Sequence, residues 1–260
     1  DAVISGGVRR SATICVFSPD DTEMATAKTG TWFIDNPQRG RSNNSALLLR
    51  DKTTKEEFSE LMKSVKEFGE PGFVWSDSTE LLVNPCVEIG MWPVCEKTKE
   101  SGWQACNLST INCSKIKTEQ DFFDACRAAT IIGTLQAGFS EFEYLGGASE
   151  RIISREALLG VSMTGIMEQH EICLDPAAQK RGASIVKKTN KKIAQMIGIN
   201  QAARTTCIKP EGTSSCILGT SSGIHPHHAK RYIRRVQANK MEPIYNYFKE
   251  VNPRACEESV

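Results

Sequence analysis

Long apolar runs are missing from this sequence. No stretch approaches the ~20 consecutive apolar residues that a helix needs to cross a bilayer, and no signal peptide is visible among the first residues. Hydrophobic residues make up 40% of the chain and charged residues 24%, which is ordinary for a water-soluble globular protein. We therefore expect a cytoplasmic protein that makes no contact with membranes.

An excess of either charge is also missing. The 32 basic and 31 acidic residues nearly balance, so no net field favours nucleic acid as a partner. A metal-binding pattern is missing too, because Pro226 interrupts the histidines of segment 225–228 and no matched cysteine pair accompanies them. The sequence therefore predicts no nucleic-acid complex and no metal site, and 225–228 is interpreted as a surface turn.

Cysteine occurs at ten positions, which are too few and too irregular for the disulfide scaffold of a small secreted domain. They indicate a reducing compartment, in which some thiols are kept for chemistry. Most are interpreted as small buried apolar residues. That interpretation covers Cys15, Cys95, Cys113, Cys126, Cys173, Cys207, Cys216 and Cys256. Cys86 and Cys106 are set apart because of the residues around them.

Helical and extended segments alternate along the chain. Apolar residues at helical spacing predict a helix over 55–68, which Gly69 ends. Thr118 and Asp121 predict the start of a second helix. Further helices are predicted over 154–163, 177–197 and 242–251, with strands over 73–75 and 204–208. This alternation is typical of the α/β class, although it does not distinguish a barrel from an open sheet.

The segment from Asn84 to Glu88 carries three chemically distinct groups at alternate positions. In an extended backbone, residues two apart lie on one side, so Asn84, Cys86 and Glu88 would face one substrate. The amide can donate and accept hydrogen bonds, a sulfur radical can remove hydrogen from carbon, and the carboxylate can act as a general base. Cys106 could approach Cys86 and supply two electrons by closing a disulfide. A buried cysteine beside a solvated glutamate, and a packing role for Cys106, remain alternatives.

Residues 209–215 read Lys-Pro-Glu-Gly-Thr-Ser-Ser and follow the predicted strand at 204–208. Gly212 allows close backbone approach to a ligand, and the hydroxyl residues offer donors. A helix that begins here would direct free amides and a positive dipole end toward phosphate. The spacing is not that of a Walker A loop. An ordinary strand-to-helix turn with a hydroxyl cap is the alternative.

Several of these motifs, in this order, resemble those of ribonucleotide reductases. Asn84-Pro85-Cys86-Val87-Glu88-Ile89 resembles the Asn-x-Cys-x-Glu finger-loop motif of that family. Cys106-Asn107-Leu108 resembles its later cysteine run. Similar blocks also lie at 6–12, 36–45 and 232–235, so the resemblance covers most of the chain.

The loop at 209–215 is similar to the family's substrate-phosphate loop, Pro-x-Gly-Thr-x-Ser, as the positions of Pro210, Gly212, Thr213 and Ser215 show. These four residues and Ser214 are therefore expected to hold a substrate phosphate. Glu211 departs from what a phosphate site favours, because an inward carboxylate would repel the phosphate. We expect its side chain to point away.

The resemblance implies a fold and a reaction. The fold is a ten-stranded α/β barrel, of which 1–260 is a fragment of a single catalytic domain, with a central finger loop at about 84–95. In the implied reaction, a Cys86 thiyl radical abstracts the ribose 3′ hydrogen, Glu88 accepts the 3′-hydroxyl proton, and Asn84 orients the sugar hydroxyls. Cys106 is implied as one member of a redox-active dithiol whose second cysteine lies outside this fragment.

The resemblance also implies a cofactor and partners. Residues 41–45 and 232–235 are more similar to the adenosylcobalamin-dependent class, which implies adenosylcobalamin as the radical source. The implied partners are a ribonucleoside di- or triphosphate, a thioredoxin-like thiol reductant and the remainder of the same chain, without which the fragment is expected to be inactive. Two alternatives stay open. One is the large subunit of a metal-dependent class I reductase, and the other is a non-catalytic nucleotide-binding module that uses the Gly212 loop.

Overall fold

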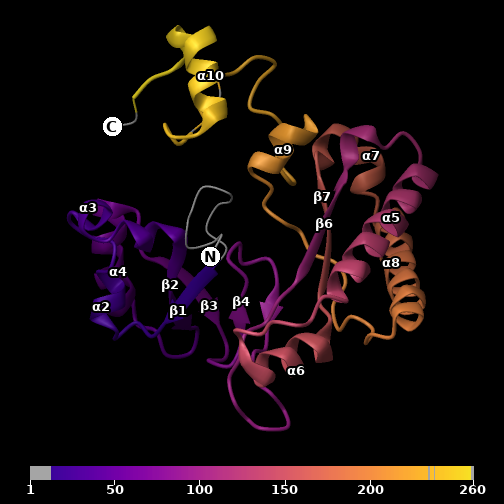
Figure 1. Ribbon diagram of the computed structural model, residues 1–260, viewed down its shortest axis with the longest axis horizontal. Coiled ribbons are helices and arrows are strands. Elements are labelled where there is room, and N and C mark those ends of the chain that lie inside the picture. The colour runs from indigo at the N-terminus through magenta and orange to yellow at the C-terminus, as the bar shows by residue number, and fades with distance from the viewer. Residues whose placement is uncertain (1–12, 234, 237, 259–260) are drawn as a thin grey trace.

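The computed structural model describes residues 13–233, 235–236 and 238–258, without the side chains of Arg41 and Thr213. The motif at 6–12 and position 234 of the motif at 232–235 therefore lie outside the described residues. Strands and helices alternate, as the sequence predicts, and the class is α/β. They build two parallel sheets with an antiparallel hairpin between them (Figure 1).

The first sheet is parallel and has the strand order β1–β2–β3. Its strands are β1 (Thr13–Phe17), β2 (Ser42–Leu49) and β3 (Gly72–Ser76), the last of which contains the predicted strand at 73–75. The connections contain α2 (Thr22–Ala25), α3 (Trp32–Asp35), the 3-10 helix η1 (Pro37–Arg41) and α4 (Lys55–Phe68). Phe17, Leu48 and Leu61 are buried between this sheet and its helices.

Helix α4 has the bounds that the sequence predicts, because both of its ends are encoded locally. The Thr54 hydroxyl accepts a hydrogen bond from the Glu57 amide, and the Glu57 carboxylate accepts one from the Thr54 amide. This reciprocal pair satisfies amides that the first turn leaves without partners. At the other end Gly69 has a φ of 72°, a left-handed conformation that glycine adopts at little cost.

The second sheet pairs β6 (Asn107–Asn112) in parallel with β7 (Leu159–Thr164). Helices α5 (Glu119–Ala137) and α8 (Pro176–Ile197) pack on each other, and α5 also packs on both strands. Phe122 and Cys126 are buried in this core as predicted, whereas Ile132 of the same helix is 56% exposed. No helix among the described residues is both long enough and apolar enough to cross a membrane.

Shorter elements complete the described chain. They are η2 (Cys113–Lys115), α6 (Gly146–Glu156), η3 (Ile166–Gln169), α7 (His170–Cys173), α9 (Thr213–Leu218), α10 (Pro243–Val251) and η4 (Pro253–Ala255). The predicted closing helix is α10. The predicted strand at 204–208 forms only an isolated bridge between Thr206 and Val161, although the segment does run alongside β7.

The helix predicted over 154–163 is wrong. Helix α6 ends at Glu156, Ala157 follows it in a left-handed conformation with a φ of 42°, and β7 begins at Leu159. The apolar residues that suggested a helix belong to a parallel strand that is buried at five of its six positions. A short, wholly buried strand has no alternating pattern, so periodicity cannot tell it from a buried helix.

A two-stranded antiparallel hairpin occupies the region between the sheets. It consists of β4 (Leu82–Val83) and β5 (Gly90–Met91), and Figure 1 shows β4 between β3 and β6. Toward the first sheet, the Asn43 side-chain amide donates to the Pro85 carbonyl at 2.8 Å. Toward the second sheet, Ile89 and Met91 pack with Leu158 in one buried cluster. The hairpin is therefore attached to both sheets.

Candidate active site

The tip of the hairpin is a tight turn rather than the extended segment that the sequence predicts. The Val87 amide donates to the Asn84 carbonyl at 2.8 Å, which closes the turn over residues 84–87. Val87 has a φ of 64°, a left-handed conformation that is costly for a β-branched side chain. Because the chain turns here, Asn84, Cys86 and Glu88 do not share one side by simple alternation.

Asn84 lies inside the hairpin. Its side chain is buried, and its Oδ1 accepts a hydrogen bond from the Ile89 amide at 2.9 Å. This bond, together with that from the Asn84 amide to the Ile89 carbonyl, holds the base of the turn closed. Cys86 is exposed at the tip. In this structure Asn84 thus shapes the loop that presents Cys86.

Cys86 and Glu88 meet at a lysine from a distant part of the chain. The Lys209 Nζ lies 3.6 Å from Cys86 Sγ and 3.6 Å from Glu88 Oε1. The Glu88 side chain is only 2% exposed, and neither of its oxygens has a hydrogen-bond partner among the described residues. A buried carboxylate is costly unless an opposite charge lies close to it. Lys209 is that charge, so the three side chains form one cluster.

Two further thiols adjoin this cluster. Burial raises the pKa of the Cys106 thiol to about 11, with the Glu88 carboxylate adding to the rise and the Lys209 ammonium opposing it. Burial also raises the pKa of Cys207 to about 12, again with Glu88 and Cys106 adding to it. Cys106 and Cys207 both pack against the buried cluster of Ile89, Met91 and Leu158, and Ile89 follows Glu88 in the chain. With pKa values raised this far, both thiols hold their protons at neutral pH.

The loop at 209–215 joins this cluster through its first residue. Pro210 is exposed, and Gly212 immediately precedes the short helix α9. The Ser215 hydroxyl donates to the Gly212 carbonyl at 2.6 Å, and the Ser214 hydroxyl donates to Glu211. The hydroxyls of Ser214 and Ser215 are thus used within the loop, and the Ser215 amide also donates to the Gly212 carbonyl at 3.1 Å. The Thr213 side chain lies outside the described part of the structure.

Glu211 anchors the loop to the second sheet. Its side chain is buried, and its carboxylate accepts a hydrogen bond from Thr110 Oγ1 of β6 at 2.5 Å as well as the one from Ser214. The strand that follows Cys106 and the loop that follows Lys209 are therefore tied together. The Glu211 carboxylate, which is unusual for a phosphate-binding loop, thus points toward β6 and holds the loop against that strand.

Lys209 and Cys207 are the members of the cluster that sequence reasoning missed. Lys209 was placed in the phosphate loop without a role, and Cys207 was interpreted as a packing residue. They lie more than 100 positions from Glu88 in sequence, so no local spacing links them to it. The one available signal is that both precede the Pro210–Ser215 motif at alternate positions of an extended segment.

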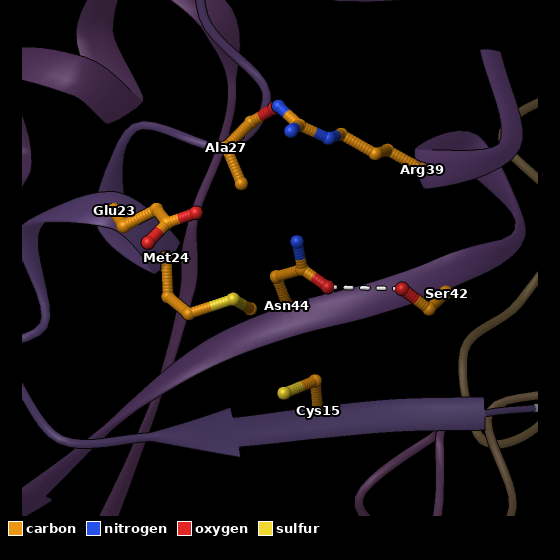
Figure 2. Close-up of a pocket in the computed structure, with 7 residues that line it drawn as sticks. All are labelled: Cys15, Glu23, Met24, Ala27, Arg39, Ser42 and Asn44. Carbon is orange, nitrogen blue, oxygen red and sulfur yellow. Dashed lines mark hydrogen bonds between the residues drawn. The ribbon is translucent and has the colours of Figure 1, made fainter. Parts of the chain in front are cut away.

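A separate small pocket lies on the first sheet. Figure 2 shows it between Met24 and the neighbouring strands that carry Cys15 and Asn44. Its volume is about 210 Å³. Asn43 and Asn44 are adjacent on β2, so their side chains leave opposite faces of the sheet, and Asn43 reaches the hairpin. Cys15 pairs with Asn44 in register. Cys15 is therefore on the face away from Cys86, which agrees with its exclusion from the redox pair.

The histidines of segment 225–228 are exposed. His227 Nδ1 lies 3.1 Å from the Tyr232 hydroxyl, and His227 Nε2 lies 3.4 Å from Glu168 Oε1. Within the residues that the structure describes, no group of three or more histidine, cysteine or acidic side chains is arranged to hold a metal ion.

Sequence comparison finds curated relatives that match nearly the whole chain, whereas no protein-family model matches it. A probable adenosylcobalamin-dependent ribonucleoside-triphosphate reductase from Dictyostelium discoideum is 26% identical over 92% of this chain and 32% of its own length. The adenosylcobalamin-dependent ribonucleoside-triphosphate reductase of Euglena gracilis is 25% identical over 93% of this chain and 34% of its own. That of Lactobacillus leichmannii is 23% identical over 94% and 37%. The chain thus spans about a third of the length of these relatives.

Solved structures with a similar fold come from the same group of proteins. A B12-dependent class II ribonucleotide reductase superposes with a TM-score of 0.58 at 21% identity, over 83% of this chain and 34% of that one. The α subunit of the class Id ribonucleotide reductase of Actinobacillus ureae also gives 0.58, at 14% identity, over 94% and 53%. The fold is therefore that of a segment of a reductase catalytic chain. The resemblance to ribonucleotide reductases that the motifs indicate is confirmed.

Proposed function

We propose that the full-length protein reduces ribonucleotides to 2′-deoxyribonucleotides, with Cys86 as the residue that carries the radical. The observation that supports this most directly is the meeting of Cys86 and Glu88 at Lys209, with Cys106 packed against the base of the same hairpin. An exposed sulfur, a buried carboxylate and a protonated thiol are the groups that such a reaction needs. The curated relatives are named for this activity.

The proposed steps use these groups in order. The Cys86 thiyl radical takes the 3′ hydrogen atom, so the C3′–H bond breaks and an S–H bond forms. Glu88 accepts the 3′-hydroxyl proton as general base, and the 2′-hydroxyl leaves as water with a proton from Cys106. A second thiol, in the part of the full-length protein outside residues 1–260, gives a hydrogen atom to C2′, and its sulfur joins that of Cys106 in a disulfide that still carries one extra electron. That electron passes to the C3′ carbonyl while Glu88 returns its proton to the 3′ oxygen. The Cys86 thiol then returns the hydrogen atom to C3′ and becomes a thiyl radical again.

The proposed phosphate site is the loop formed by Pro210, Gly212, Thr213, Ser214 and Ser215. Its support is the position of the loop at the start of α9, where Gly212 precedes the helix, and the attachment of the loop to Lys209, which contacts Cys86 and Glu88. A phosphate held there would lie at the edge of the thiol cluster. We assign Asn84 the role of shaping the hairpin, and we propose that its amide also orients the sugar hydroxyls.

The proposed radical source is adenosylcobalamin. The residues present fit a bulky group near the hairpin tip, because Cys86 and Val87 are exposed there and would face it. When bound, this cofactor supplies an organic radical by homolysis of its cobalt–carbon bond, and the protein positions the thiol. The Cys86 side chain is accessible at the surface of the described residues.

The remaining partners follow from the same proposal. The two sheets and the hairpin between them are proposed as part of a ten-stranded α/β barrel that the rest of the chain completes, with residues 84–95 as its finger loop. The substrate is a ribonucleoside di- or triphosphate. A thioredoxin-like protein would reduce the disulfide after each turnover.

Replacing Cys86 with serine in the full-length protein tests the proposal. Deoxyribonucleotide formation should fall below detection, because a hydroxyl is a far poorer hydrogen-atom carrier than a thiol, while nucleotide binding should persist. Cys15→Ser is the matched control, since this exposed thiol lies on the far face of the first sheet, and it should keep full turnover. Product formation by the Cys86→Ser protein would contradict the assignment.

The equal structural similarity to a class Id α subunit supports a second candidate, a chain that receives its radical from another subunit. The two candidates differ in what restores activity to the purified protein. Turnover on addition of adenosylcobalamin and a dithiol alone is the result expected here. Turnover only after a second protein subunit is added would favour the alternative, and nucleotide binding without any turnover would favour a non-catalytic module.

A further inference from the structure

Lys209 is the charged group that the reaction steps above leave without a task. Its backbone is fixed, because its amide donates to Ser162 Oγ of β7 at 2.9 Å and Ser162 is fully buried. It stands three positions before Gly212. Its side chain is 17% exposed and extends from the second sheet to the hairpin. The second sheet therefore fixes the point from which the Lys209 side chain extends.

The ammonium group contacts the thiol of Cys86 and the carboxylate of Glu88, both from the hairpin. Two further thiols, Cys106 and Cys207, pack against the buried cluster that contains Ile89 of the same hairpin. Among the described residues, Lys209 is the only cation that contacts Cys86 or Glu88. At 3.6 Å its Nζ is close enough for charge compensation yet too distant for a short hydrogen bond to Glu88.

The buried Glu88 carboxylate is the group most affected by the charge of Lys209. Its side chain is 2% exposed, and its oxygens lack hydrogen-bond donors in the described structure. Burial without compensation favours the protonated form of a carboxyl group, whereas a nearby cation favours the charged form. A protonated Glu88 could not accept a proton from substrate. Lys209, 3.6 Å from Glu88 Oε1, is the cation paired with this buried carboxylate in the described structure.

We propose that Lys209 is a positioning residue that keeps Glu88 charged and directed toward Cys86, so that it can accept the 3′-hydroxyl proton of the substrate. This inference rests on the proposed function for the role of Glu88. It adds a link between the phosphate loop and the chemistry, because the residue that compensates Glu88 is the one that leads into the Pro210–Ser215 loop. One backbone segment would then position both the substrate, through the Pro210–Ser215 loop, and the general base Glu88, through Lys209.

The test compares the pH dependence of kcat in the full-length wild type and in Lys209→Met. Without the cation, the Glu88 carboxylate should take up a proton more readily and so be lost as a base at higher pH. The acidic limb of the profile should therefore move to higher pH by roughly one unit, and kcat on that limb should fall on the order of tenfold. The KM for nucleotide should change by less than about threefold, because the positioning role concerns a proton and not binding. Lys209→Arg, which retains a cation, should restore the limb toward its wild-type position.

Lys187→Met is the matched control, because Lys187 is exposed on α8, the helix that packs against α5. Its profile should coincide with that of the wild type. An unmoved acidic limb in Lys209→Met, or a rise in KM with no change in the limb, would overturn the proposal.

A second readout does not need turnover. Because Lys209 lowers the pKa of the Cys106 thiol and Glu88 raises it more strongly, Lys209→Met should raise that pKa above about 11, measured by pH-dependent alkylation and mass spectrometry. The double variant Glu88→Gln with Lys209→Met leaves no buried charge unpaired and should bring the pKa below the wild-type value. If the pKa of Cys106 were unchanged in both variants, the proposed position of Lys209 would be wrong. A wild type without reductase activity would instead contradict the proposed function, and the Cys106 titration would still test the position of Lys209.

Discussion

Among single residues, Cys106 shows most directly how burial can suit a group to the step proposed for it. Its pKa is raised to about 11 by burial and by the Glu88 carboxylate, so the thiol keeps its proton at neutral pH. A protonated thiol can give that proton to a leaving hydroxyl, whereas a thiolate cannot. The raised pKa also protects the thiol from unwanted reaction, because the thiolate is the nucleophile.

This leads to a prediction for alkylation of Cys106 by iodoacetamide. The rate should rise about tenfold per pH unit through neutral and mildly alkaline pH and level off only near pH 11, where the thiol has lost its proton. In Glu88→Gln the levelling should occur at lower pH, because the carboxylate that raises the pKa is gone. Mass spectrometry of the labelled peptide measures both. A plateau below pH 9 in the wild type would contradict the buried, acid-flanked placement.

Among the elements, α5 depends on the box that caps its first turn. The Thr118 hydroxyl accepts from the Asp121 amide at 3.1 Å, and the Asp121 carboxylate accepts from the amides of Lys117 and Thr118. These amides, that of Lys117 most, hold the pKa of Asp121 below its usual value. The contribution of Asp121 to stability is therefore present above the ordinary pKa of an aspartate and is lost as pH falls through its lowered one.

Thr118→Ala should lower the free energy of unfolding by about 1 kcal/mol at neutral pH, since it removes one half of the box. Thr118→Ser, which keeps the hydroxyl, should lose much less. Urea unfolding of each variant measures the difference. Equal stabilities of the alanine and serine variants would show that the cap contributes little to α5.

For the whole molecule, Gly160 of β7 is the residue at which the second sheet, the hairpin and the segment that carries Cys207 come together. A methyl group added there would lie 2.5 Å from Leu108 Cδ2, 3.0 Å from Cys207 Sγ and 3.0 Å from Ile89 Cδ1. These atoms belong to β6, to the segment before the phosphate loop and to the hairpin. Close approach of all three requires glycine, so at Gly160 the hairpin, β6 and the segment that carries Cys207 pack directly on β7.

Gly160→Ala should therefore destabilise the protein by about 1–3 kcal/mol through overpacking and should also reduce turnover, because the hairpin must move. Gly90→Ala is the comparison for stability, since a methyl group at Gly90 meets nothing within 4 Å. Thermal or urea unfolding together with an activity assay would detect the change. A Gly160→Ala protein as stable and as active as the wild type would contradict this account of the hairpin's position.

Local sequence by itself determined much of this protein. Interactions between residues three or four positions apart determine the bounds of α4, the caps of α4 and α5 and the α/β alternation. Such short spacings can be recognised directly in the sequence. The identity of Cys86, Glu88 and Cys106 as candidate site residues also came from local motifs. No pattern distinguished the buried strand β7 from a helix, because burial on both faces removes the alternation that marks a strand.

Only the tertiary structure decided which groups act together. The turn at Asn84 depends on the hairpin that β5 closes, and the sharing of Lys209 between Cys86 and Glu88 depends on packing between segments more than 100 residues apart. Charge compensation and burial are properties of distance in space. A sequence records only distance along the chain, so it could single out Cys86, Glu88 and Cys106 as candidates but not the lysine that contacts Cys86 and Glu88.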